Sequence, residues 1–170
     1  MKEVEVKILE VNVDDVVAKL LALGAKKFFE GDMDVIYYDT ASRSLKNQDY
    51  RLRLRTKGET NELTFKHKIS KKGVKIEEEL QVSVDNFEIM KEIMGRLDYA
   101  EVDSYKKHRL SYSLEGVLFE FDTIPGVPTL MEIEGKDEQA VFEWVEKLGF
   151  SRDDAKPWTG GDVLKYYKAL

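Results

Sequence analysis

Acidic side chains recur at every second position in several short segments of the chain. The sequence begins MKEVEVKI, in which Glu3, Glu5 and Lys7 alternate with valine and isoleucine. Acidic pairs with the same spacing occur further along: Glu120 with Asp122, and Glu132 with Glu134. Carboxylate oxygens are the ligands that Mg²⁺ and Mn²⁺ prefer. These pairs are therefore candidates for binding a divalent metal.

Basic side chains show the same spacing in other segments. They are Arg51, Arg53 and Arg55 in RLRLR, Lys66 and Lys68 in ELTFKHK, and Lys107 and Arg109 in KKHRL. Guanidinium and ammonium groups bind phosphate oxygens, and the arginine fork can do so with two hydrogen bonds. Acids that suit a metal and bases that suit phosphate together indicate chemistry on a polyanion.

Strands must position these residues, because alternate side chains of a strand lie on opposite faces. Alternation predicts strands at 2–9, 34–39, 50–57, 62–69, 74–84, 105–114, 117–123 and 129–135. Apolar periodicity predicts helices at 13–23, 86–97 and 137–148, with a short one at 162–169. Glycine-containing breaks such as Glu115-Gly116 indicate hairpin turns between strands.

Two architectures are compatible with one charged face on nearly every strand. An antiparallel sheet with one solvated face is the commoner meaning of such alternation. Here, however, acids and bases are segregated by strand, and like charges opposed across strands cost stability. The apolar faces also give the helices a surface to cover. We therefore predict an α+β fold: an antiparallel, eight-stranded closed β-barrel with helices packed outside and a charged lumen.

Composition excludes several classes of function. The formal net charge of −6 predicts no general nucleic-acid footprint. The absence of cysteine excludes a disulfide, a thiolate zinc site and a thiol nucleophile. We find no signal segment and no apolar run near 18 residues, so we expect a cytoplasmic protein with no membrane partner.

Several motifs resemble, in order along the chain, those of the CYTH superfamily, also called the triphosphate tunnel metalloenzymes. They are EVEVK (3–7), which fits an ExExK signature, YYDT (37–40), LRLR (52–55), LTFK (63–66), KKHR (106–109) and FEFDTIPGVPTLMEIEG (119–135). The resemblance spans nearly the whole chain and implies one such domain over residues 1–170, with the barrel as a triphosphate tunnel. Dimers are common in this family, so a homodimer is the assembly to test.

The resemblance also implies roles for individual residues. Mg²⁺ or Mn²⁺ would be held by a set of acids: Glu3, Glu5, Glu120, Asp122, Glu132 and Glu134. The triphosphate would be bound by a set of bases: Lys7, Arg53, Arg55, Lys66, Lys107 and Arg109. Glu3, Glu5 and Lys7 are the expected catalytic residues. Glu77 and Glu79 are left open between a metal role and ion pairing within the lumen.

Three classes of function are compared. The first is a triphosphate-processing metalloenzyme, either a class IV adenylate cyclase that converts ATP to cyclic AMP and pyrophosphate or an inorganic or thiamine triphosphatase. The second is a non-catalytic module that binds nucleotides or polyphosphate. The third is a stable β-domain whose charged face serves protein contacts. The order and spacing of the motifs favour the first class, and within it the cyclase.

Overall fold

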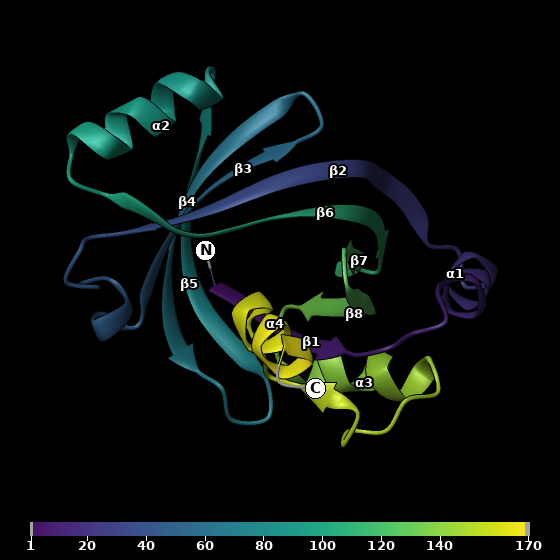
Figure 1. Ribbon diagram of the computed structural model, residues 1–170. Coiled ribbons are helices and arrows are strands. Elements are labelled where there is room, and N and C mark those ends of the chain that lie inside the picture. The colour runs from purple at the N-terminus through teal and green to yellow at the C-terminus, as the bar shows by residue number, and fades with distance from the viewer. Residues whose placement is uncertain (1, 169–170) are drawn as a thin grey trace.

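The computed structural model describes residues 2–168, and Figure 1 shows the arrangement of its elements. Its strands are β1 Lys2–Ile8, β2 Lys26–Asp39, β3 Tyr50–Lys57, β4 Thr60–Ser70, β5 Lys75–Val84, β6 Ala100–Leu114, β7 Val117–Ile124, β8 Val127–Gly135 and β9 Ala155–Lys156. Its helices are α1 Val13–Ala22, α2 Phe87–Arg96, α3 Glu138–Lys147 and α4 Gly160–Lys168, with a short 3₁₀ turn at Lys46–Gln48.

Eight of the strands form a closed antiparallel barrel. The order around the ring is β5-β4-β3-β2-β6-β7-β8-β1, and β1 pairs back onto β5 with Glu3 opposite Glu77. β9 pairs with the end of β1, where Lys156 lies opposite Lys7. Closure leaves no unpaired edge in the ring and separates an inner face from an outer face. The predicted eight-stranded barrel with helices outside is confirmed.

Turn chemistry sets the register of the hairpins. Between β6 and β7, Glu115 and Gly116 both have positive φ angles, of 51° and 79°. A two-residue loop with two positive φ angles matches the right-handed twist of its flanking strands. The resulting register puts Ser111 opposite Glu120 and Arg109 opposite Asp122. A local turn therefore determines which charged side chains meet inside the barrel.

Helices cover the outer face on two sides. α1 and α3 pack over the outer side chains of β1, β7 and β8, where Phe119 lies edge-on to Trp144 with ring centroids 5.1 Å apart. α2 covers β2 and β3 through Met94, which packs with Leu54. α4 lies across one end of the barrel, where its buried Val163 packs with side chains from β7 and β8 (Figure 1).

Two predicted strands are longer in the structure than the sequence indicated. The strand expected at 34–39 begins at Lys26, and the strand expected at 105–114 begins at Ala100. In the β2–β6 ladder each added segment pairs with the predicted part of the other strand: residues 26–33 pair with 107–113, and residues 100–104 pair with 36–39. The ladder contains register shifts near Lys27 and near Tyr37. Such irregularities break the alternation, so these segments are strands because they are paired and not because of their pattern.

The helices leave some apolar side chains on the outer face of the barrel uncovered. On β5, the outward Leu80 and Val82 are 69% and 59% exposed. On α2, which Asn86 caps at its N-terminus, Leu97 just past the last turn is also exposed. The helix predicted at 162–169 is α4, and its last predicted residue lies outside the described part of the chain.

None of the helices in residues 2–168 is both long enough and apolar enough to cross a membrane.

Removal of the Phe119 ring tests the outer core. Phe119 is fully buried against Trp144, so Phe119→Ala is expected to lower the free energy of unfolding by about 3–5 kcal/mol. Urea denaturation followed by circular dichroism measures the change. Leu97→Ala, at a side chain that is 59% exposed, is the control and should change the free energy by less than about 0.5 kcal/mol. A loss below about 1 kcal/mol for Phe119→Ala would contradict this packing.

Candidate functional site

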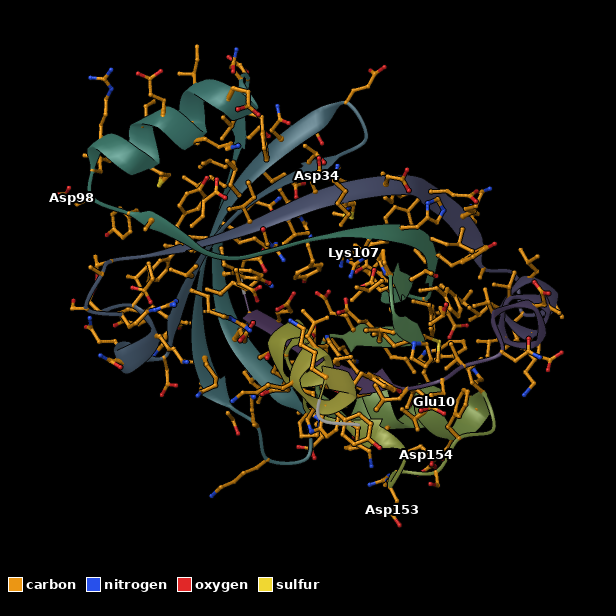
Figure 2. All side chains as sticks on the ribbon, in the orientation of Figure 1. Glu10, Asp34, Asp98, Lys107, Asp153 and Asp154 are labelled. Carbon is orange, nitrogen blue, oxygen red and sulfur yellow. The ribbon has the colours of Figure 1, made fainter. Side chains whose placement is uncertain are left out.

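The barrel encloses a cavity whose wall is mostly charged. Its volume is about 560 Å³, and 16 of the 24 residues that line it are acidic or basic. Figure 2 shows Lys107 pointing into the barrel, whereas Asp34 lies at the outer surface. Asp34 pairs there with Lys106, the sequence neighbour of Lys107, at 3.1 Å. Alternation along β6 therefore places one lysine inside the cavity and the next one outside it.

Three carboxylates gather at one side of the cavity. Glu3 and Glu5 come from β1, and Glu134 lies directly opposite Glu5 on β8. One oxygen from each carboxylate lies within 4.8 Å of the other two. This all-oxygen cluster suits a divalent cation such as Mg²⁺, which takes carboxylate, water and phosphate oxygens. The donor set therefore fits the metal that the sequence predicts.

Lysines neutralise two members of this cluster. Lys66 contacts Glu3 at 2.9 Å, and Glu5 is contacted at 2.7 Å by both Lys7 and Lys75. Burial raises the pKa of Glu3, but Lys66 and Lys75 lower it by more, and the carboxylate stays ionised. The same attraction, from Glu132 and Glu5, overcomes the effect of burial and raises the pKa of Lys7.

Glu134 differs from the other two members because no ion pair within residues 2–168 involves it. Burial raises its pKa to about 8, and the negative charges of Glu3 and Glu5 act in the same direction. At neutral pH the metal-free cluster therefore holds a proton on Glu134. A divalent cation would take the place of that proton.

The other predicted metal ligands lie against bases. Arg109 makes two parallel hydrogen bonds of 2.6 Å to Asp122 and also pairs with Glu120 and, at 2.7 Å, with Glu132. Lys107 contacts Asp122 at 2.7 Å. Burial raises the pKa of Asp122, but Arg109 and Lys107 outweigh it and lower the value. The structure thus divides the six predicted metal ligands into two sets: Glu3, Glu5 and Glu134 form the cluster, whereas the other three pair with bases. Metal binding by Glu120, Asp122 and Glu132 stays a prediction.

The predicted phosphate-binding bases line the same cavity. Arg53 is buried; one of its guanidinium nitrogens donates to the Thr64 hydroxyl at 3.3 Å, and the same nitrogen lies 3.8 Å from Glu79. Its Nε is a buried donor with no hydrogen-bond partner in the described residues. Arg55 pairs with Glu62 at 2.5 Å. All six predicted bases therefore reach one cavity, and one of them has an unused donor.

The predicted set of site residues omitted several residues that line the cavity. Tyr37 and Tyr105 line the wall, as do Lys75 and Arg51. Burial raises the pKa of Tyr37, but Arg53 and Arg51 act against it and the net shift is downward. Tyr37 is two residues after Val35 on β2, and Tyr105 is two residues before Lys107 on β6, so each tyrosine lies on the same face of its strand as that residue. That parity was the available signal, but phenol rings suit a core as well as a lumen.

Glu77, left open between two roles, is an ion-pair partner in this structure. It is fully buried and contacts Arg51 and Lys75, the latter at 3.0 Å. It does not belong to the cluster of Glu3, Glu5 and Glu134. Glu79 lies 2.7 Å from Lys66 and is likewise paired.

Replacement of Glu134 should change stability and metal binding in opposite directions. The carboxyl has an ordinary pKa of 4.5 when unfolded and about 8 when folded, so the folded state binds more protons between these values. Its contribution to the free energy of unfolding is thus present at low pH and is lost as the pH rises toward 8. Glu134→Gln removes this loss, and the variant without metal should melt at a higher temperature than the wild type above pH 8.

The same variant lacks one oxygen ligand, so added Mn²⁺ should raise its melting temperature less than that of the wild type. Differential scanning calorimetry at pH 5 and pH 8.5, with and without Mn²⁺, measures both effects. Each kcal/mol corresponds to roughly 2–4 °C in a domain of this size. Glu138→Gln, at an acid on α3 outside the cavity, is the control. A variant that is less stable than the wild type at pH 8.5 without metal would contradict the assigned repulsion.

Comparison with known proteins places this architecture in a family. Residues 1–157 match the CYTH domain family. A Methanocaldococcus jannaschii protein with the provisional name adenylate cyclase is 28% identical over 163 residues, which cover 91% of this chain and 93% of that protein.

Solved structures share the fold along nearly the whole chain. A Pyrococcus horikoshii protein superposes with a TM-score of 0.82 and 25% identity, covering 95% of this chain and 98% of its own. A proposed adenylyl cyclase from Hippeastrum, reported to have a dominant triphosphatase activity, superposes with a TM-score of 0.71 and 17% identity over 98% and 95% of the two chains. Since the family match covers most of the sequence and the barrel is of the expected kind, the chain belongs to the CYTH domain family.

Proposed function

We propose that this protein is a divalent-metal-dependent enzyme that binds ATP by its triphosphate inside the barrel and converts it to cyclic AMP and pyrophosphate. CYTH tunnel proteins bind triphosphates, use divalent metals and are generally enzymes. The provisional name of the Methanocaldococcus jannaschii relative supports the cyclase reaction.

One observation carries the proposal of an anionic substrate. The Nε of Arg53 is a buried hydrogen-bond donor without a partner in the described residues, in a cavity lined by further bases. An unpaired buried donor costs stability unless a ligand satisfies it. A phosphate oxygen is the acceptor that suits a guanidinium in a wall of lysines and arginines. The triphosphate would thus lie along the inner faces of β3, β4 and β6.

The roles of the residues follow from their positions. Glu3, Glu5 and Glu134 would hold Mg²⁺ or Mn²⁺, which polarises a phosphoryl oxygen and lowers the pKa of a nearby hydroxyl or water. The basic side chains would bind the phosphate oxygens and stabilise the charge that develops as the phosphorus–oxygen bond breaks: Lys7, Arg53, Arg55, Lys66, Lys107 and Arg109. Asp122, Glu120 and Glu132 would orient Arg109 by their ion pairs.

A second candidate reaction is hydrolysis of inorganic triphosphate or of an organic triphosphate. The basic side chains of the cavity wall favour it, because they suit phosphate oxygens whatever group the phosphates carry. The barrel from Hippeastrum, reported to have a dominant triphosphatase activity, makes hydrolysis the reaction to test beside cyclisation.

Product analysis distinguishes the two reactions. The protein is incubated with Mn²⁺ and either ATP or tripolyphosphate, and the products are separated by ion-exchange chromatography. We expect cyclic AMP and pyrophosphate from ATP. Orthophosphate from either compound would support the hydrolase instead. Binding of both compounds without any product would show a binding module and would overturn the catalytic part of the proposal.

Two neighbouring lysines provide a matched test of the cavity. Lys107→Ala removes an ammonium group from the interior and should lower kcat/KM by about 10²–10³-fold, because charge stabilisation in an enclosed site is large. Lys106→Ala removes the same group from the outer surface, where its side chain is 81% exposed, and should leave kcat/KM within about twofold. Equal effects of the two substitutions on a folded protein would contradict the assignment of the cavity as the active site.

A further inference from the structure

Lys75 lies against the acidic cluster but has no role in the proposed binding of phosphate. Its ammonium group is 2.7 Å from Glu5, 3.0 Å from Glu77 and 3.4 Å from Glu3. The residue is only 3% exposed. Lys75 thus bridges two of the three carboxylates that would hold the metal, Glu3 and Glu5, together with a third acid that is not in the cluster.

The barrel closure fixes this arrangement. β1 and β5 pair antiparallel with Glu5 opposite Lys75 and Glu3 opposite Glu77. Glu77 is fully buried and is also held by Arg51 from β3. Glu77 is therefore held in place without Lys75. It offers the Lys75 ammonium group a hydrogen-bond acceptor away from Glu3 and Glu5.

A divalent cation and the ammonium group compete for the same oxygens. Mg²⁺ needs its ligand oxygens at about 2.0–2.1 Å. An ammonium group that bridges those carboxylates would be a few ångströms from the ion, and like charges at that distance repel strongly in a buried site. Without either cation, the clustered carboxylates would repel one another instead.

We propose that Lys75 is a built-in substitute for the metal. In the metal-free barrel it holds Glu3 and Glu5 together, and when a divalent ion binds, its ammonium group moves from them toward Glu77. Lys75 is then a positioning residue that keeps the cluster assembled and makes metal binding weaker and more readily reversible. This inference rests on the metal site of the proposed function.

Mn²⁺ binding to a charge-removing variant tests the competition. Lys75→Gln keeps an N–H donor but removes the positive charge. We expect it to bind Mn²⁺ at least about tenfold more tightly than the wild type, measured by isothermal titration calorimetry, and to melt at a lower temperature without metal. Lys75→Arg keeps the charge and should return the affinity toward the wild-type value. Lys2→Gln, on the same β1–β5 ladder but exposed, is the control and should bind like the wild type.

Weaker or unchanged Mn²⁺ binding by folded Lys75→Gln would overturn the role of Lys75 as a competitor and would leave the metal site in place. Failure of the wild type to bind Mn²⁺ at all would overturn the proposed function itself. Should the variant not fold, crystal structures of the wild type with and without Mn²⁺ decide the question. The ammonium group should leave hydrogen-bonding distance of Glu5 when the ion is present, and its retention there would overturn the proposal.

Discussion

The enclosure of many charges inside one barrel is the constraint on which this structure depends. Buried charges are tolerated only when partners of opposite sign and hydrogen bonds compensate for lost hydration. Here the compensation crosses strand boundaries: Lys7 from β1 pairs with Glu132 from β8 at 2.5 Å, and Lys66 from β4 pairs with Glu3 from β1. The pairing of β1 with β8 on one side and with β5 on the other brings these strands together, so the ionic network and the closure of the barrel depend on each other.

The charged groups in the lumen are not equally well paired, and the exceptions are informative about function. Asp122 has partners on several of its sides, whereas Glu134 faces other acids and has a raised pKa. Arg53 keeps one buried donor without a partner in the described residues. A lumen selected only for stability would pair such groups or replace them with apolar side chains. The acid without an ion pair in the described residues suits a cation, and the free Nε donor of Arg53 suits an anion; a metal–triphosphate complex carries both.

The outer layers serve the lumen by holding the strands in register. The apolar faces of β1, β7 and β8 pack under α1 and α3, and these strands carry the acids. β2 and β3, which carry Tyr37 and Arg53, pack under α2. The cavity wall is thus built on strands whose outer sides are fixed in two separate apolar cores. β5 has a largely uncovered outer face, although its inner face carries Lys75 and Glu77.

The sequence by itself determined the inner and outer faces, because strand parity is a local property that needs no partner. Glu3, Glu5 and Lys7 are placed inside by the alternation of MKEVEVKI, and the same rule places Lys107 inside and Lys106 outside. Family motifs then indicated what the inner face binds. The alternation failed where the β2–β6 ladder contains irregularities, and the first half of β2 was missed for that reason.

Tertiary structure alone decided which charges meet. Glu134 joins Glu3 and Glu5 because β8 pairs with β1, whereas Glu132, two residues earlier, lies against Lys7 and Arg109. Lys75 reaches the acids because the ring closes between β1 and β5, strands separated by 66 residues of chain from Ile8 to Lys75. Register and closure are set by long-range pairing, and a shift of two residues would preserve every inward-facing side chain while changing the ion pairs between strands. A pattern with a period of two cannot distinguish between such registers.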